Sequence, residues 1–282
     1  MKICAGIVLF NPDIDRLKQN VDGILPQVDL VIFVDNDSVD KEKLVEKFSG
    51  NRFIWICNEN NLGVAAALNQ LMGHASQNGY EWVLTLDQDS VCGGDLVEKL
   101  FSASKLYNNA AMISPKVLER GVEKQENDDK NQTNVEEVPI CITSGCLTNV
   151  KAVLDTGGFN EWLFIDQVDH DMCIRLRYRG YRILRVNTAE LNQEYGLKHV
   201  RRKILFKEYE YHNYTPLRVY YQARNILYMT RKYGSDFKPY PVWQYFRPLV
   251  VFGIKFIFEP NKMRRLSAFT RGYFTGLFMK IV

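Results

Sequence analysis

Four short apolar runs in the first ninety residues constrain the fold of this chain more than any other feature. They are residues 3–9, 30–34, 53–57 and 82–86. Helical spacing of apolar residues follows the first run over residues 13–25, and a helix of small residues is expected over residues 64–75. Continuous apolar strands that alternate with helices predict a mainly parallel sheet covered by helices on both faces.

Acidic triplets stand at the carboxyl ends of two of these strands. Asp35-Asn36-Asp37-Ser38 follows the second strand, and Asp87-Gln88-Asp89-Ser90 follows the fourth. Ligands of open α/β sheets bind just beyond such strand ends. Two carboxylates one residue apart can converge on a hard divalent cation, which in turn can hold a diphosphate. The alternative is a turn whose Asp and Ser residues cap the next helix.

A third polar cluster lies within residues 164–175, at the start of a helix that is expected to end at Gly180. It contains Asp166, Asp169, His170 and Asp171. Helix capping accounts for one or two of these groups, because acids favour the first turn of a helix, but hardly for all four. A carboxylate in this cluster is a candidate general base, since like-charged neighbours raise its pKa.

The rest of the chain divides into a second half of the main domain and a basic tail. Residues 120–138 have the composition of a solvated hairpin or loop, residues 139–143 indicate a strand, and a helix is expected from Thr215-Pro216 to Gly234. We therefore expect a catalytic domain over residues 1–234 and a helical tail over residues 235–282.

The tail is rich in basic and aromatic residues. From residue 239 onward it holds seven Lys or Arg residues and a single acid, Glu259. One interpretation is a segment that lies on an anionic lipid surface. The other is a solvated face of helices that cap the catalytic domain. The first is favoured, so a membrane surface is an expected partner.

Composition excludes several classes of protein. The 36 Lys and Arg residues are nearly balanced by 33 Asp and Glu residues, so nucleic acid is not an expected partner. Six cysteines without a C-x-x-C pair indicate buried thiols in a reducing compartment. The apolar start is interpreted as a first strand, and no uncharged apolar run reaches the length of a membrane span.

Seven segments in a fixed order resemble a known family. They are residues 7–12, 34–38, 58–69, 86–90, 143–145, 164–175 and 220–225. Together they resemble the inverting nucleotide-sugar glycosyltransferases of family 2, in particular the rhamnosyltransferase-like members that build bacterial surface polysaccharides. The resemblance covers about residues 3–232. It implies the GT-A fold, a Rossmann-like α/β domain with a mixed, mainly parallel sheet, here followed by the basic helical segment.

The resemblance also implies a donor site. Asp35 would hydrogen-bond the nucleotide base, with Asn61 and Gly63 lining the same pocket. Asp87 and Asp89 would form the acidic motif that holds Mg²⁺ or Mn²⁺, and Asp87 would be shared between the metal and the ribose. A nucleoside-diphosphate sugar is therefore the expected substrate.

The same resemblance makes Asp169, which stands six residues before Arg175, the catalytic base. The family often has an acid immediately before the base, whereas this chain has Val168. The choice among Asp166, Asp169 and Asp171 therefore stays open.

A metal ligand of the family is replaced in this chain. Relatives often carry a metal-binding His where Gln193 stands. The third protein ligand is accordingly undecided, with Glu194, His199 or water as the alternatives.

Other residues are candidates for the sugar and acceptor sites. Ser144, Gly145 and Trp162 would shape these sites, although a tight turn and an aromatic core residue explain them equally well. Asp166 and Asp171 are further candidates. Among the polar residues of the helix at 220–225, Arg224 is the one expected to be functional.

The expected reaction is metal-dependent transfer of a sugar, with inversion, to a hydroxyl of a lipid-linked saccharide in O-antigen or capsule biosynthesis. The first donor candidate is dTDP-L-rhamnose, and a UDP-hexose is the second. The expected location is the cytoplasm, at the inner face of the cytoplasmic membrane. Two alternatives stay open: a haloacid-dehalogenase-like phosphotransferase with Asp35 as its nucleophile, and an inactive nucleotide-sugar-binding subunit.

Overall fold

The protein forms two compact units, which are described separately. The computed structural model describes residues 2–119, 134–193, 200–204, 207–211, 214–234 and 262–281, together with residues 246, 249 and 252. The first unit comprises residues 1–164 and 168–194, and the second comprises residues 165–167 and 195–282. The described residues therefore include nearly the whole first unit.

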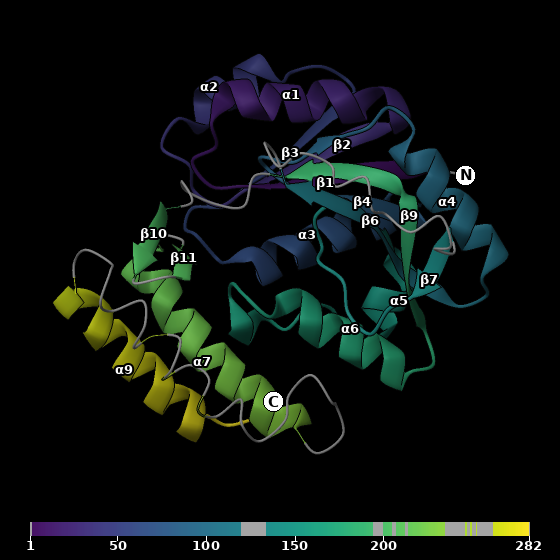
Figure 1. The fold of residues 1–282 in the computed structure, drawn as a ribbon. Coiled ribbons are helices and arrows are strands. Elements are labelled where there is room, and N and C mark those ends of the chain that lie inside the picture. Colours follow the sequence, from purple (N-terminus) through teal and green to yellow (C-terminus); the bar gives the residue numbers. More distant parts are fainter. Residues whose placement is uncertain are drawn as a thin grey trace. The chain divides into compact units, whose positions relative to one another are not determined.

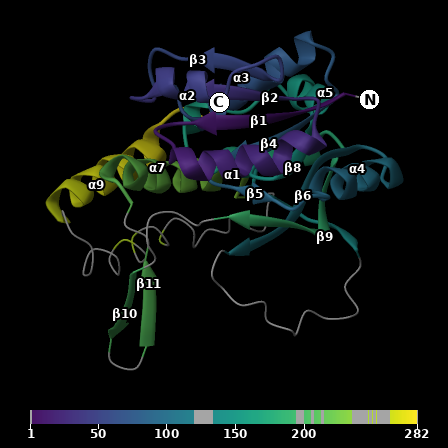
Figure 2. The ribbon, with the colours of Figure 1, turned by 90° about the horizontal axis from the view of Figure 1, so that it is seen from above.

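The first unit is built on one mixed sheet. Its described strands are β1 (Ile3–Leu9), β2 (Leu30–Asp35), β3 (Phe53–Cys57), β4 (Trp82–Asp87), β5 (Val91–Cys92), β6 (Ala110–Glu119), β7 (Val135–Glu137), β8 (Cys146–Asn149) and β9 (Arg182–Gln193). Their order is β3-β2-β1-β4-β8-β6-β9-β5, with β7 paired to β9 (Figures 1 and 2). The first four strands are mutually parallel, as predicted, whereas β8 runs antiparallel to both β4 and β6.

Helices cover both faces of this sheet. They are α1 (Ile14–Ile24), α2 (Lys41–Lys47), α3 (Val64–Gln77), α4 (Leu96–Leu106), α5 (Val150–Asp155) and α6 (Val168–Tyr178). On one face, Leu17 of α1 and Leu100 of α4 share a core with Phe33 of β2. On the opposite face, α3 lies so close to β1 that a Cβ on Gly6 would be 2.1 Å from the Leu71 side chain. Figure 1 shows α1 and α3 on opposite sides of the sheet.

One predicted strand is wrong. Residues 139–143 are irregular, and the neighbouring strands are β7 and β8, which begin at Val135 and Cys146. Pro139 has no N–H to donate to a strand ladder. The chain then turns through Gly145, whose φ of +70° is a left-handed conformation that favours glycine. The solvated segment expected at 120–138 lies mostly outside the described residues.

The second unit contains a hairpin and two packed helices. Strands β10 (Val200–Ile204) and β11 (Lys207–Tyr211) pair antiparallel. Helices α7 (Pro216–Tyr233) and α9 (Lys262–Phe278) lie side by side in both views (Figures 1 and 2). The predicted start of α7 is confirmed, because the Thr215 hydroxyl accepts a hydrogen bond from the Arg218 N–H. No helix in the described part of the chain has the length and apolarity needed to cross a membrane.

Candidate active site

The register of the parallel strands places two predicted site residues on either side of β1. Asp35 of β2 lies opposite Leu9, and Asp87 of β4 lies opposite Val8. Since neighbouring strands are about 4.8 Å apart, the two Cα atoms are about 10 Å apart at the same edge of the sheet. This edge therefore gathers the ends of two strands that are distant in sequence.

Asp35 has a buried carboxylate with one unused oxygen. The side chain is fully buried, and its Oδ1 accepts a hydrogen bond from the Ser38 N–H at 2.9 Å. Its Oδ2 is buried as well and has no hydrogen-bond partner among the described residues. Because an unsatisfied buried acceptor is costly, this oxygen is well suited to a donor supplied by a ligand. Next to Asp35 in the sheet, partial desolvation and the Asp35 charge raise the pKa of the Cys57 thiol.

The loop after β1 ties both acidic loops together. The Phe10 N–H donates to Gln88 Oε1 at 2.9 Å, within the second triplet. The Asn11 N–H donates to Ser38 Oγ at 2.8 Å, and Asn11 Oδ1 accepts from the Val39 N–H at 2.9 Å. Asn11 has a φ of +48°, a conformation that asparagine tolerates better than most residues. The loops that follow β1, β2 and β4 therefore form one hydrogen-bonded rim.

A buried amide network, which the sequence analysis missed, supports the same rim. Asn58 Nδ2 donates to Asn36 Oδ1 at 2.9 Å and to Gln70 Oε1 at 3.0 Å. Asn36 Nδ2 in turn donates to the Gly63 carbonyl oxygen at 3.2 Å. Asn36 and Asn58 each occur at the end of a predicted strand, and that position is the signal that would have identified them.

The loop of Asn61 and Gly63 is fixed against the segment that precedes α6. Asn61 Oδ1 accepts a hydrogen bond from the Gly63 N–H at 2.9 Å, and Gly63 has a φ of +86°. A Cβ on Gly63 would be 2.5 Å from the ring of Phe164. The Val64 N–H donates to the Phe164 carbonyl oxygen at 2.7 Å. Glycine is thus required here both by its φ and by the close approach of Phe164.

The second acidic triplet is anchored through its main chain. The Asp87 N–H donates to Ser144 Oγ at 3.2 Å, and Asn20 Nδ2 donates to the Asp87 carbonyl oxygen at 2.8 Å. Arg16 Nε donates to the Asp89 carbonyl oxygen at 2.7 Å. The Asp87 side chain is exposed and Asp89 is half-buried. These contacts fix the loop from which the two carboxylates project.

The donor set of this loop fits a hard divalent cation. Carboxylate oxygens are the ligands that Mg²⁺ and Mn²⁺ prefer, and Mg²⁺ is often held by one or two carboxylates together with substrate phosphates. Val91, two residues after Asp89, pairs with Asn192, so the end of β9 at Gln193 reaches the same loop. Glu194 and His199 lie outside the described residues. In the described ranges no three His, Cys, Asp or Glu residues form a metal-binding group.

Ser144 and Gly145 form a buried turn beside the acidic loop. Ser144 Oγ also lies 2.6 Å from Ser90 Oγ, and a Cβ on Gly145 would be 2.7 Å from the Leu191 side chain. Three residues before this turn, the sulfur atom of Cys141 lies 3.9 Å from the sulfur atoms of Cys146 and Cys173. Hydrogen bonding to these two thiols raises the pKa of Cys141 well above its ordinary value. The contacts of Ser144 show how the turn supports the triplet.

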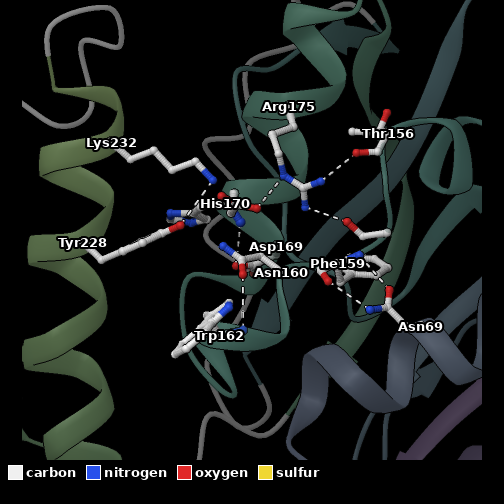
Figure 3. Close-up of polar contacts among 12 residues, drawn as sticks. Asn69, Thr156, Phe159, Asn160, Trp162, Asp169, His170, Arg175, Tyr228 and Lys232 are labelled. Atoms are coloured by element: carbon white, nitrogen blue, oxygen red, sulfur yellow. Dashed lines mark hydrogen bonds and ion pairs between the residues drawn. The ribbon is translucent and has the colours of Figure 1, made fainter. Parts of the chain in front are cut away.

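Two acids in α6 have different surroundings. Asp169 is half-buried in the first turn, and its Oδ1 accepts a hydrogen bond from the His170 N–H at 2.9 Å (Figure 3). Asp171 is fully buried, and its Oδ2 lies 2.6 Å from Arg175 Nε. The same guanidinium donates to the carbonyl oxygens of Thr156 and Gly158 at 3.0 and 2.7 Å. Asp171 therefore orients an arginine that holds the preceding loop.

Within the second unit, α7 holds the short segment that contains Asp166. Asp166 Oδ1 lies 3.3 Å from Arg218 Nη2. Asn225 Nδ2 donates to the carbonyl oxygens of Ile165 and Asp166 at 2.7 and 2.9 Å. The buried Arg224 donates from Nε to Asn225 Oδ1 at 2.8 Å, which orients that amide. Sequence reasoning singled out Arg224 and missed Asn225, which makes the direct contacts.

The loop between α5 and α6 presents Trp162 at the surface. The Trp162 side chain is 60% exposed, and the Trp162 N–H donates to Asn160 Oδ1 at 3.2 Å. Asn69 of α3 binds both the N–H and the carbonyl oxygen of Phe159 at 2.7 and 2.9 Å (Figure 3). The loop is thus fixed at its base, and the Trp162 side chain is largely exposed.

A sequence model of the glycosyl transferase family 2 domain matches residues 4–154, which include both acidic triplets and the loop of Asn61 and Gly63. The chain belongs to glycosyl transferase family 2. This glycosyltransferase is 27% identical over 245 residues to the dTDP-rhamnosyl transferase RfbF of Shigella flexneri, covering 82% of this chain and 80% of that protein.

Solved structures share the fold of this glycosyltransferase. The mannosyltransferase PcManGT of Pyrobaculum calidifontis, in complex with GDP-Man and Mn²⁺, matches with a TM-score of 0.61 at 14% identity, covering 99% of this chain and 88% of that one. Residues 1–349 of S. aureus TarS with UDP-GlcNAc match at 0.60 and 14% identity, with coverage of 98% and 82%. GalNAc-T7 with UDP, GalNAc and Mn²⁺ matches at 0.59 and 12% identity, covering 99% of this chain but 56% of the longer one.

These comparisons confirm the predicted GT-A fold and the glycosyltransferase class. The phosphotransferase alternative is wrong, since the matching family transfers sugars.

Proposed function

We propose that this glycosyltransferase moves L-rhamnose from dTDP-rhamnose to a hydroxyl of a lipid-linked saccharide, in the assembly of a bacterial O-antigen or capsule. The similarity to RfbF, which spans most of both chains, supports this donor. UDP and GDP sugars occur in the structural relatives, so a UDP-hexose is the second candidate. The enzyme would act in the cytoplasm, at the inner face of the cytoplasmic membrane.

The buried, unpartnered Oδ2 of Asp35 is the observation that carries the donor proposal. Thymine and uracil each present a ring N–H that can donate to a carboxylate. Asn61 and Gly63 would line the same pocket, because the amides of Asn36 and Asn58 hold their loop against the end of β2. A pyrimidine base bound there would place the diphosphate toward the second triplet along the sheet edge.

Asp87 and Asp89 would hold Mg²⁺ or Mn²⁺ in the proposed enzyme. When bound, the cation would neutralise charge on the nucleoside diphosphate as it departs. Asp87 would also contact the ribose. Ser144 would keep this loop in place through the Asp87 N–H, which makes it a positioning residue in the proposal.

Asp169 would be the general base. The acceptor oxygen attacks the anomeric carbon from the face opposite the leaving group, the bond from that carbon to the diphosphate oxygen breaks, and the acceptor proton passes to the Asp169 carboxylate. This single displacement inverts the anomeric centre. Asp171 is a weaker candidate because its carboxylate is buried against Arg175. Asp166 is weaker because α7 holds its segment and Arg218 lies against its carboxylate.

The acceptor site is proposed along the loop of Trp162. An exposed indole offers a flat apolar face on which a sugar ring can stack. Gly145 and Arg224 support neighbouring segments, through the turn at Ser144 and through Asn225. Their proposed effect on the acceptor is therefore indirect.

A donor panel tests the proposal. The full-length protein is mixed with dTDP-rhamnose, UDP-glucose, UDP-GlcNAc and GDP-mannose, each with and without Mg²⁺ or Mn²⁺, and the thermal midpoint is followed. We expect metal-dependent stabilisation, strongest with dTDP-rhamnose, because a ligand that binds only the folded state stabilises it by mass action. Release of dTDP in the presence of a bacterial lipid extract then distinguishes turnover from binding alone. Stabilisation by all donors alike, independent of metal, would contradict the proposal.

A further inference from the structure

One face of α9 packs closely on α7, and this packing determines which face of α9 points away from α7. Gly272 and Gly276 lie on the inner face, where a Cβ would be 2.3 Å from the Tyr220 carbonyl oxygen and 2.5 Å from that of Arg224. Arg231 of α7 donates to the carbonyl oxygens of Gly276 and Met279 at 3.0 and 2.7 Å. Such close contacts fix the rotation of α9 about its axis, so its opposite face is also fixed.

That opposite face carries an exposed apolar stripe. Met263 is 75% exposed, Phe274 55% and Phe278 79%. With 3.6 residues per turn, these three side chains point within about 60° of one another. Leu266, 37% exposed, widens the stripe on one side. Large apolar side chains gathered on one exposed face mark an interaction surface rather than scattered surface residues.

The charged residues of α9 itself are all positive. Arg264 and Arg271 flank it on one side and Lys262 on the other, and each of these residues is exposed. Residues 262–281 contain no Asp or Glu. An apolar stripe between basic flanks is typical of helices that lie in the interface of an anionic bilayer. Each basic residue close to such a surface strengthens binding about fivefold.

A hollow of about 580 Å³ lies beside the stripe. Its lining residues are Tyr220, Thr270, Arg271, Phe274 and Thr275. The Arg271 guanidinium lies 5.5 Å from the centre of the Tyr220 ring. The Arg271 guanidinium, with Thr275 beside it in the lining, matches the oxygens of a phosphate, and Phe274 continues the apolar surface outward.

We propose that the outer face of α9 binds an anionic phospholipid surface. Met263, Phe274 and Phe278 enter the headgroup region, and Arg271 receives a lipid phosphate in the hollow. This proposal rests on the proposed function, which includes a membrane surface as a partner, and it names the residues that contact that surface. Its test does not require catalysis, so failure of either proposal can be recognised separately.

Vesicle sedimentation of the full chain tests this surface. Vesicles contain either phosphatidylcholine alone or phosphatidylcholine with phosphatidylglycerol, at low and high salt. We expect binding to the anionic vesicles that weakens with salt. The double variant Phe274→Ser, Phe278→Ser should bind at least tenfold more weakly, and Arg271→Gln about fivefold more weakly, on anionic vesicles only. Leu106→Ser, at an apolar side chain of α4 that is 75% exposed, is the control and should bind like the parent.

Two further measurements keep the result interpretable. Circular dichroism and the metal-dependent thermal shift with dTDP-rhamnose should be unchanged in the double variant, because the substituted side chains are exposed. Parent-like vesicle binding by that variant would overturn the proposal. A dimeric parent that becomes monomeric in the double variant, without any vesicle binding, would also overturn it and assign the face to a second copy of the chain.

Discussion

The Val64 N–H donates a hydrogen bond of 2.7 Å to the carbonyl oxygen of Phe164. Val64 begins α3 directly after the loop of Asn61 and Gly63, and Phe164 lies five residues before Asp169. Phe164 has a φ of +61° and a ψ of −63°, the rare and strained conformation of a γ-turn. The loop proposed to hold the nucleobase is thus hydrogen-bonded to the segment that leads into Asp169, the proposed general base. Nucleotide binding and the position of Asp169 are expected to depend on one another.

Gly63→Ala tests this contact. The substitution places a Cβ 2.5 Å from the Phe164 ring at a φ of +86°. Gly79→Ala is the matched control, since Gly79 has a φ of +72° with no atom within 4 Å of the added Cβ. We expect Gly79→Ala to lose about 1 kcal/mol through the backbone. Gly63→Ala should lose about 1–3 kcal/mol more, because its φ of +86° and ψ of 167° are nearly exclusive to glycine and its Cβ meets Phe164. Urea unfolding measures the loss of unfolding free energy in each variant. Equal losses would mean that the close contact with Phe164 does not contribute to stability.

Asp35→Asn tests the base pocket. The substitution removes the charge of the buried carboxylate whose Oδ2 is free to accept a donor. Because hydrogen bonds to charged groups are worth about 1.5–3 kcal/mol, dTDP affinity should fall about 10- to 100-fold by calorimetry. Asp37→Asn is the control, since Asp37 is exposed and asparagine tolerates its φ of +69°. Unchanged affinity in Asp35→Asn would place the base elsewhere.

Asp171→Asn should impair folding. The Asp171 carboxylate is fully buried against Arg175, whose side chain is 19% exposed. Removing one partner of a buried pair typically costs about 3–5 kcal/mol, so the free energy of unfolding should fall by that order. Asp95→Asn breaks an exposed pair with Lys99 at the same helical spacing and should cost less than about 1 kcal/mol. If Asp171→Asn lowers the free energy of unfolding no more than Asp95→Asn does, the pair of Asp171 and Arg175 does not stabilise the fold.

Stability should decrease at alkaline pH through two buried thiols. Burial raises the pKa of Cys4 and of Cys92 from the ordinary value of 9.0 to about 12. Between these values the unfolded chain loses the thiol protons while the folded chain keeps them. The free energy of unfolding therefore falls as pH rises from 9 toward 12, by at most about 1.4 kcal/mol per pH unit for each thiol.

Urea titrations from about pH 8 to pH 10.5 measure this slope. Replacing both buried thiols, as Cys4→Ala and Cys92→Ala together, lowers stability at every pH but should flatten the slope. Cys57→Ala, at an exposed position, should change the slope less. A double variant with the slope of the parent would exclude the thiols as its origin.

The parallel half of the fold follows from the sequence because its strands are continuous apolar runs. Residues 30–34 and 82–86 are predicted to within one residue, as β2 and β4. The resemblance implied a mixed sheet, but the antiparallel strands were not located in the sequence, since strands such as β9 mix charged, polar and apolar residues. Their pairing depends on partners far away in the chain, which local patterns do not encode.

The candidate site shows the same division. Acids at strand ends, such as Asp35 and Asp87, could be placed at one sheet edge from the order of the elements alone. The pairing of Asp171 with Arg175 was available from their i, i+4 spacing. The contact of Gly63 with Phe164 was not, because it joins residues about a hundred positions apart, both with uncommon positive φ angles.

Asp169→Asn, compared with the parent in dTDP-rhamnose binding and in dTDP release with a lipid extract, tests the central claim most directly. We predict unchanged donor affinity and a loss of transfer of about 10²- to 10⁴-fold, the usual worth of a general base. Asp166→Asn serves as the comparison and should retain much more transfer. Parent-like transfer by Asp169→Asn would contradict the account and move the base to another residue.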